Sequence, residues 1–241
     1  MALRSNSTVR SINLSSNQIK KEEAQSISEI LKNNTTITSI NLSYNPLGDG
    51  ILFITECLKL NSTITSINLS KCFKSDTIIA SIDHSGNQIK NTISQFISEC
   101  LKLNSTIRSI DISGNQVGNE GVHDILEGLK SNSTITSLNL SDNQIGKPGT
   151  QSFSEFLKLN STITSIDLYL NQLKNEGAQV ISECLLSNST ITSINLCENK
   201  IGNEGAQFLA EALKFNSTIT SLDLSENQIH KEGALSIADC L

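Results

Sequence analysis

The chain has 241 residues, a formal net charge of −6, no tryptophan and only 4% aromatic residues. Lysine and arginine never occur more than two in a row, so the charge pattern does not favour nucleic acid or an anionic membrane surface as a partner. No apolar stretch approaches the roughly 20 residues that a membrane-spanning helix needs.

A repeated unit extends from the first residues almost to the last, and Ser131–Leu157 shows it most clearly. Each unit opens with Asn-Ser-Thr and continues as Ile-Thr-Ser-Ile-Asn-Leu. The alternation of apolar and polar residues predicts a short, half-buried strand. The central strand residues are Ile12, Ile40, Ile67, Ile82, Ile110, Leu138, Ile166, Ile194 and Leu222.

The second half of each unit has the period of a helix. Ala178, Ile181 and Leu185 lie at i, i+3 and i+7, on one helical face, and Gly177 precedes them. Each unit is therefore expected to be a strand, a tight turn and a helix. Because one such unit cannot bury its apolar face alone, the units must stack on one another.

Two segments show the pattern LxxLxLxxN: ITSLNLSDN at 135–143 and ITSINLCEN at 191–199. With a spacing of 28 residues in most units, this pattern resembles the ribonuclease-inhibitor-like subfamily of leucine-rich repeat proteins. The resemblance implies one α/β domain over residues 1–241. That domain would be a curved solenoid, or horseshoe segment, with a parallel β-sheet on the concave face, α-helices on the convex face, about nine strands and eight helices.

An asparagine follows nearly every strand, and the resemblance implies that it points inward at the turn. There it would pair backbone groups that would otherwise be buried without partners. Cys72 takes this position in one unit, a substitution that the family pattern tolerates. The asparagines are Asn17, Asn45, Asn87, Asn115, Asn143, Asn171, Asn199 and Asn227.

One short repeat, at about 68–85, breaks the period, because Ile67 and Ile82 are too close to accommodate a helix between them. One interpretation is a decayed or truncated unit. The other is a hinge or binding loop around a gap in the convex helical layer. The residues that such a loop would expose are Lys71, Phe73, Lys74 and His84.

The cysteines and the Asn-x-Ser/Thr triplets indicate an intracellular protein. Four of the six cysteines share a position with Ile30, Gly128, Phe156 and Ala212, which is typical of packing and not of disulfides. Free thiols fit a reducing compartment. The triplets recur with the period and are interpreted as turns, not glycan acceptors. We expect a cytoplasmic location, reached in some cases by delivery into a host cell.

The sequence contains no recognisable catalytic, metal-binding or cofactor-binding motif. Its three histidines, His84, His123 and His230, occupy different positions of the repeat, and no HExxH, CxxC, GxSxG or phosphate loop occurs. Asn-Glu-Gly recurs at 119–121, 175–177 and 203–205 and places a glutamate near the start of the expected helix, where its charge interacts favourably with the helix dipole. We therefore expect no catalytic residues, no cofactor, no metal site and no enzyme activity.

Positions where the repeats differ are the candidates for partner binding. The concave columns contain only Ser and only Asn or Asp, which form a flat and mildly acidic surface. A partner protein would use the exceptions beside the strands, although neutral drift would also produce them. With the residues of the irregular repeat, the candidates are Tyr44, Tyr169, Leu170, Cys197, Glu198, Glu226, Lys71, Phe73 and Lys74.

Three functions follow from these observations and the resemblance. The first is a non-enzymatic protein-interaction module, and the second a scaffold with no specific site. The third is a regulator of a small GTPase, because Ran GTPase-activating proteins share the repeat. The three arginines, Arg4, Arg10 and Arg108, do not match that family's functional arginine. Neither end shows a polar capping unit, which predicts end-to-end self-association or a longer array.

Overall fold

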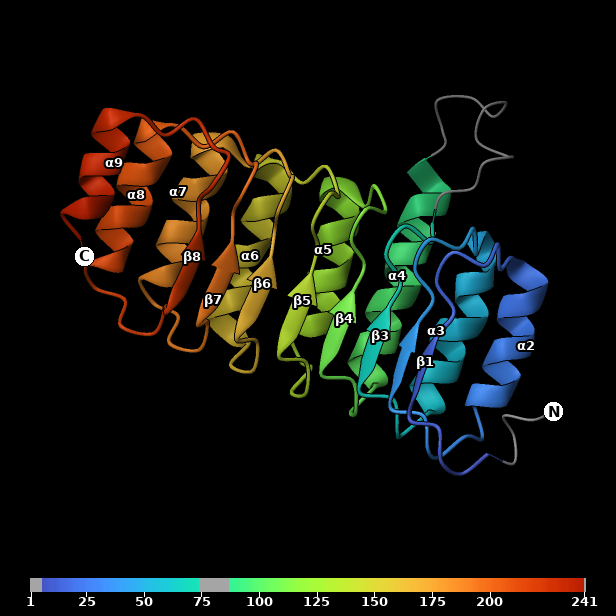
Figure 1. The fold of residues 1–241 in the computed structure, drawn as a ribbon. Coiled ribbons are helices and arrows are strands. Elements are labelled where there is room, and N and C mark those ends of the chain that lie inside the picture. Colours follow the sequence, from blue (N-terminus) through green and yellow to red (C-terminus); the bar gives the residue numbers. More distant parts are fainter. Residues whose placement is uncertain (1–5, 74–86, 241) are drawn as a thin grey trace.

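The computed structural model describes residues 6–73 and 87–240, and within them eight parallel strands form one sheet in chain order (Figure 1). Equivalent residues pair across neighbouring strands, as Ser137 with Ser165 and Leu138 with Ile166. The strands are β1 Ser11–Asn13, β2 Ser39–Asn41, β3 Ser66–Asn68, β4 Ser109–Asp111, β5 Ser137–Asn139, β6 Ser165–Asp167, β7 Ser193–Asn195 and β8 Ser221–Asp223.

The helices form a second layer behind the sheet, and each packs against the next along the array (Figure 1). A short 3-10 helix, η1 Gly48–Gly50, precedes one of them. Strands and helices run in opposite directions, so all strand ends lie along one edge and all helix ends along the other (Figure 1). The helices are α2 Lys21–Leu31, α3 Ile51–Leu60, α4 Asn87–Leu103, α5 Gly118–Leu129, α6 Lys147–Leu159, α7 Lys174–Leu185, α8 Asn203–Leu213 and α9 Lys231–Ala238.

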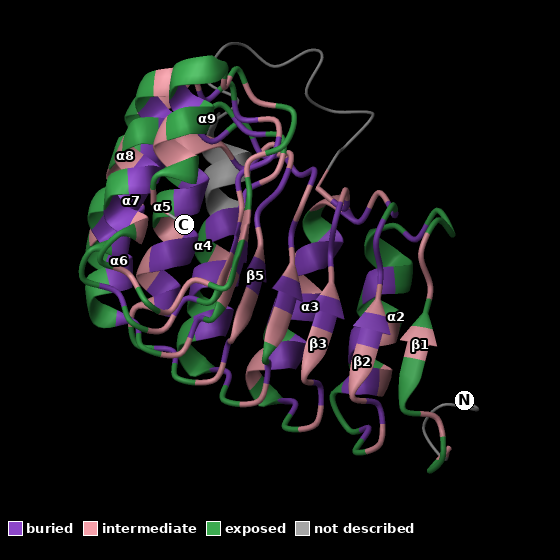
Figure 2. Cartoon of the chain, turned by 60° about the vertical axis from the view of Figure 1, so that its left-hand side comes forward, coloured by how far each residue is buried: buried purple, intermediate pink, exposed green. Residues whose placement is uncertain are grey.

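The core lies between the two layers and continues through all interior repeats. Ile40, Leu138 and Ile194 are at most 2% exposed, and Phe153 and Phe156 are the largest fully buried side chains. Figure 2 shows this continuous buried stripe and an array that bends with the sheet on its inner face. This is the α/β solenoid that the repeat pattern predicts.

The asparagine that follows each strand forms a buried ladder of hydrogen bonds, as the resemblance implies. Asn143 accepts the backbone N–H groups of Asn115 and Val117 from the preceding repeat. Its Nδ2 donates to the carbonyls of Ile112, Leu140 and Ser141. One fully buried side chain therefore satisfies five backbone groups, two of them donors that the neighbouring repeat could not pair alone.

Cys72 replaces asparagine in this ladder and supplies part of the same bonding. Its Sγ lies 3.0 Å from the Leu42 carbonyl and 3.6 Å from that of Ser70. Burial raises the pKa of this thiol to about 12, while a backbone hydrogen bond from Asn45 acts in the opposite direction. The thiol thus stays neutral and acts as both donor and acceptor.

The asparagine of each Asn-Ser-Thr triplet forms a second ladder, at the edge where the helices end. Asn132 accepts the N–H groups of Thr134 and Ile135, and its Nδ2 donates to the carbonyls of Leu101 and Asn104. Asparagines at this position are only 5–7% exposed from Asn34 to Asn188. The interpretation of the triplets as turns is confirmed.

Glycines allow neighbouring helices to approach closely. A Cβ at Gly128 would lie 2.5 Å from the carbonyl oxygen and 2.7 Å from the Cα of Ser98 in α4. Gly121, at the start of the same helix, would meet the Ser94 side chain at 2.6 Å. The close packing of α5 on α4 therefore depends most on Gly128, where the backbone of Ser98 leaves no room for a Cβ.

Three expectations for the irregular repeat are wrong for the residues that the structure describes. β3 pairs directly with β4, so Ile67 is opposite Ile110 and the described sheet lacks the further strand expected between them. Asn87 begins α4 and is not a turn asparagine. The expected gap in the helical layer is also absent from the described residues, because α4 contacts both α3 and α5. Ile82, Lys74 and His84 lie outside the residues that the structure describes.

Candidate functional site

The residues that lie three positions after the end of each strand form a line along the edge where the strands end. We call this line the post-strand ridge. All of its members have left-handed backbone conformations, with φ between 53° and 67°. The neighbouring columns are nearly invariant, whereas this column changes from repeat to repeat. The members are Ser16, Tyr44, Lys71, Gly114, Asp142, Leu170, Glu198 and Glu226.

The backbone of the ridge is fixed by the array and does not depend on its side chains. The N–H of Tyr44 donates to the carbonyl of Ser70 at 2.9 Å, and that of Lys71 donates to Ser113 at 2.8 Å. A left-handed conformation costs an ordinary L-residue roughly 1–2 kcal/mol. Glycine or asparagine would be favoured there on local grounds, yet Tyr44, Lys71 and Leu170 are present. The ridge side chains are therefore not explained by backbone preference.

The N-terminal half of the ridge holds one lysine between an aromatic ring and a carboxylate. Lys71 Nζ lies 5.3 Å from the centroid of the Tyr44 ring and 3.9 Å from Asp142 Oδ2. A Cβ at Gly114 would lie 2.6 Å from Lys71 Cγ and 2.7 Å from its Cε. The absence of a side chain at Gly114 therefore lets Lys71 extend across a whole repeat to Asp142. Tyr44 remains 56% exposed.

The C-terminal half of the ridge is acidic and includes one exposed leucine. The Tyr169 hydroxyl donates to Glu198 Oε1 at 3.1 Å, and this bond raises the pKa of Tyr169. Leu170 is 38% exposed, whereas Cys197 is buried at 9%. Glu226 extends the acidic half of the ridge into the last repeat and is exposed.

The Asn and Asp column of the concave face has a structural role that the sequence analysis missed. Each side chain accepts the backbone N–H two residues later, as Asn139 does from Ser141 and Asp167 from Tyr169, both at 2.9 Å. The hydroxyl and the N–H of Ser225 both donate to Asp223 Oδ1, and these two bonds lower the pKa of Asp223. Asn and Asp form this turn better than Ser or Thr does, and the restriction of the column to Asn and Asp was the signal that could have revealed it.

Most of the predicted binding residues lie along the strand-end edge, spread from the second repeat to the last. Phe73 is half-buried, packs against the core and donates its N–H to Asn115, so it is a poor candidate for binding. Lys74 lies outside the described residues. Gly114 and Asp142 were not predicted, although comparing one position across all repeats would have found them. Five candidates lie on the ridge, namely Tyr44, Lys71, Leu170, Glu198 and Glu226, and two, Tyr169 and Cys197, immediately precede it.

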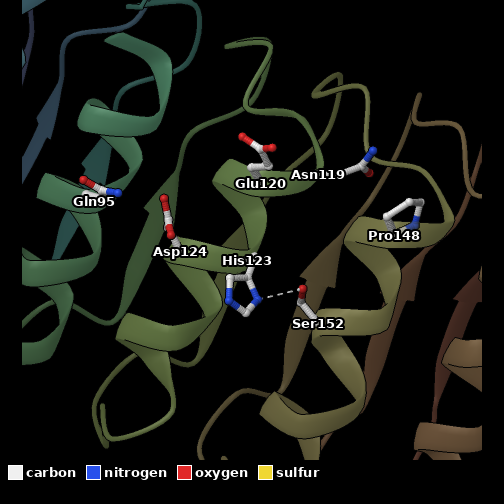
Figure 3. A pocket seen from close by; sticks show the side chains of 7 residues that line it. All are labelled: Gln95, Asn119, Glu120, His123, Asp124, Pro148 and Ser152. Carbon is white, nitrogen blue, oxygen red and sulfur yellow. Dashed lines mark hydrogen bonds between the residues drawn. The ribbon is translucent and has the colours of Figure 1, made fainter. Parts of the chain in front are cut away.

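A shallow hollow of about 420 Å³ lies on the helical face between α4, α5 and α6 (Figure 3). His123 Nδ1 and Ser152 Oγ are joined by a hydrogen bond of 3.2 Å. Desolvation raises the pKa of Asp124, but its side chain points toward α4 while His123 points toward α6 (Figure 3). Asp124 therefore does not extend the Ser152–His123 pair into a Ser–His–Asp arrangement.

Within the described residues, no three His, Cys, Asp or Glu side chains gather to bind a metal ion. The same part of the chain contains no helix with the length and apolarity to cross a membrane.

Comparison with known proteins identifies the repeat and the fold. The family model described as "Leucine Rich repeat" matches residues 5–28, 33–53, 103–126, 131–154, 159–182, 187–210 and 215–238. No curated protein matches the chain.

Two solved structures show the same fold at low sequence identity. Actin-binding site 2 of leiomodin-1 is 23% identical, with a TM-score of 0.53 over 60% of this chain and 85% of that one. The C-terminal domain of tropomodulin from Caenorhabditis elegans is 14% identical, with a TM-score of 0.54 over 61% of this chain and 90% of that one.

Proposed function

Because the chain belongs to the leucine-rich repeat family, we propose that it is a non-enzymatic module that binds a partner protein through the post-strand ridge. The observation that supports this most directly is the ridge itself. It combines a varied set of exposed side chains with a backbone that the array holds rigid. Function is often found on such loops on rigid scaffolds.

Tyr44 and Lys71 are the best anchors for a partner. Tyrosine is enriched at the residues that dominate binding energy, and Tyr44 is more than half exposed. Lys71 is held between Tyr44 and Asp142 before any partner binds. A side chain that is already positioned loses less conformational freedom on association, so its contacts contribute more to affinity.

The ridge also has a polarity that indicates the partner's chemistry. Lys71 lies in the N-terminal half, whereas Asp142, Glu198 and Glu226 follow toward the C-terminal end. A partner with basic groups facing the acidic half would associate faster at low salt, because complementary charges steer the encounter. The apolar surface of Leu170 lies within this acidic half and would contact an apolar group of the partner.

The proposal can be tested by affinity capture with the intact chain, followed by binding measurements on single variants. Tyr44→Ala and Lys71→Ala should each weaken binding by about fivefold or more, the level expected of an anchor residue. Gly114→Ala should do the same, because it displaces Lys71 while retaining it. The matched control is Lys147→Ala, which removes an exposed lysine from the start of α6. Equal affinity for all four variants and the unmodified chain would exclude the ridge.

Actin is the first purified partner to test, because one similar structure is an actin-binding site of leiomodin-1. Cosedimentation with actin filaments and a monomer-binding assay would together cover both forms of actin. Absence of binding in both assays would remove actin as the partner and leave affinity capture to identify another.

The alternative proposal is that the chain regulates a small GTPase. Regulation of a small GTPase predicts a changed rate of GTP hydrolysis when the chain is added. An unchanged rate across a panel of small GTPases would exclude it. The cytoplasm, including that of a host cell, remains our proposed site of action, supported by six cysteines that form no disulfide.

A further inference from the structure

A row of exposed leucines follows the edge where the helices end, opposite the post-strand ridge (Figure 1). Leu60, Leu103 and Leu159 are the last residues of α3, α4 and α6, and Leu186 directly follows α7. These four side chains are 56–66% exposed. Each lies in a repeat with another described repeat on either side, so its exposure belongs to the interior of the array. We call these four residues the helix-end row.

The fold does not require leucine in this row. Leu60, Leu103 and Leu159 directly precede the asparagine of the Asn-Ser-Thr triplet, where other repeats have Asn33, Ser131 and Ser187. The asparagine ladder forms equally well after either residue type, because Asn132 follows a serine and makes the same bonds. A single exposed leucine is common on a protein surface, whereas several in line indicate an interaction surface.

The loops that carry the row contain cations and no carboxylate, although the whole chain has a net charge of −6. A lysine near the C-terminus of a helix interacts favourably with the helix dipole, which explains why lysine recurs there. Its position also places a positive charge beside nearly every leucine of the row. Across segments 58–66, 101–109, 129–137, 157–165 and 185–193, the charged residues are Lys59, Lys102, Lys130, Lys158 and Arg108.

Glutamates lie about one helical turn behind these lysines, on the helical face. Lys130 Nζ is 2.7 Å from Glu155 Oε2 on the next helix, and Lys59 is paired in the same way. Among the residues that the structure describes, Lys102 and Lys158 join no such ion pair. Two lysines of the row are therefore held in place by glutamates, and two keep the capacity to pair with the carboxylates of a partner.

We propose that the helix-end row binds an acidic amphipathic helix of a partner protein. Apolar side chains of that helix would pack on the leucines, and its carboxylates would face Lys102 and Lys158. Packed helices of the array lie about 8–10 Å apart, and seven residues of a helix rise by about 10 Å. One apolar residue in every seven would therefore meet one repeat. This inference does not depend on the proposed function, because no residue of the ridge belongs to the row.

An anionic membrane surface fits the row less well than a helix does. Such a surface is broad and would also face the glutamates behind the lysines. Exposed charges act together over about 8 Å at physiological ionic strength, so the glutamates would offset the lysines across that contact. A helix is only about 10 Å wide with its side chains, so it can cover the leucines and lysines without covering the glutamates.

Two synthetic helical peptides with the same leucines test the proposal on the intact chain. One peptide carries glutamates beside its leucines and the other carries lysines, and fluorescence anisotropy measures the affinity of each. We expect the acidic peptide to bind about tenfold more tightly or better, with an advantage that shrinks as salt is raised. Equal affinity for the two peptides, or no binding of the acidic one, would overturn the proposal.

Substitutions that the array itself makes locate the contact. Leu103→Ser and Leu159→Ser should each weaken binding of the acidic peptide by about fivefold or more. Ser131→Leu should strengthen it, because it fills the gap in the row between Leu103 and Leu159. Serine is already present at this position in Ser131, so both serine variants should fold, as circular dichroism would verify. Unchanged affinity in all three variants would exclude the row.

Two controls separate this surface from the ridge and from lipid. Leu170→Ser removes an exposed leucine from the ridge and should leave peptide binding unchanged. Tyr44→Ala should also leave it unchanged, so failure of the ridge as a binding site would not affect this result. Vesicles of phosphatidylcholine, with and without phosphatidylserine, should not bind the chain. Vesicle binding that Leu103→Ser abolishes would overturn the proposal and assign the row to a lipid surface.

Discussion

Replacing Asn143 with alanine tests whether the asparagine ladder holds the repeats together. Asn143 is fully buried and makes five side-chain hydrogen bonds to backbone groups. Alanine would leave the N–H groups of Asn115 and Val117 without an acceptor, in a site that water does not reach. Each orphaned buried donor costs about 1–3 kcal/mol, so we expect the free energy of unfolding to fall by about 2–6 kcal/mol.

The measurement is urea denaturation of the reduced protein, followed by far-ultraviolet circular dichroism. Asn139→Ala is the matched control, because Asn139 makes only local bonds to Ser141 at a half-exposed position, and its loss should cost about 1 kcal/mol. Asn143→Cys should fall between the two, since Cys72 shows that a thiol can replace part of the bonding. A loss for Asn143→Ala no larger than that of the control would refute the role of the ladder.

Three further outcomes are expected. Gly128→Ala should destabilise the protein by about 1–3 kcal/mol through its clash with α4, whereas Gly146→Ala, whose nearest neighbour would be 3.6 Å away, should change unfolding free energy far less. Alkylation of the native protein should reach half-buried Cys240 first and buried Cys72 and Cys100 only on unfolding, as peptide mapping would show. Burial raises the pKa of both buried thiols from 9.0 to about 12, so the unfolded chain loses protons first and stability should fall between pH 9 and 12 in denaturation curves at increasing pH.

The fold could be predicted well from the sequence because the same pattern of apolar and polar residues recurs in nearly every repeat. Apolar residues with a period of two, then with the period of a helix, allow only stacked strand–helix units, and the structure confirms this. The expectation of a ninth strand between β3 and β4 was wrong because it rested on the local pattern of one matching segment alone. Pairing depends on the whole repeat: β3 pairs with β4 directly, and α4, with its buried Ile97 and Leu101, fills the helical layer between α3 and α5.

The candidate site was predicted only in part, because the residue pattern does not show which side chains from different repeats come into contact. Tyr44 and Leu170 are unusual residues in their column and were noticed for that reason. Gly114 and Asp142 are ordinary turn residues, and their importance depends on the path of the Lys71 side chain. That path is a three-dimensional property, since it crosses from one repeat over a second to a third.

The reach of Lys71 also limits how this protein can be rebuilt. Repeat proteins are attractive for engineering because one repeat can be replaced by another of the same length. Here the ionic contact depends on three units at once, and a new residue at position 114 would break it although neither Lys71 nor Asp142 had been changed. A library built by shuffling whole repeats should therefore keep residues 44–142 together as one block.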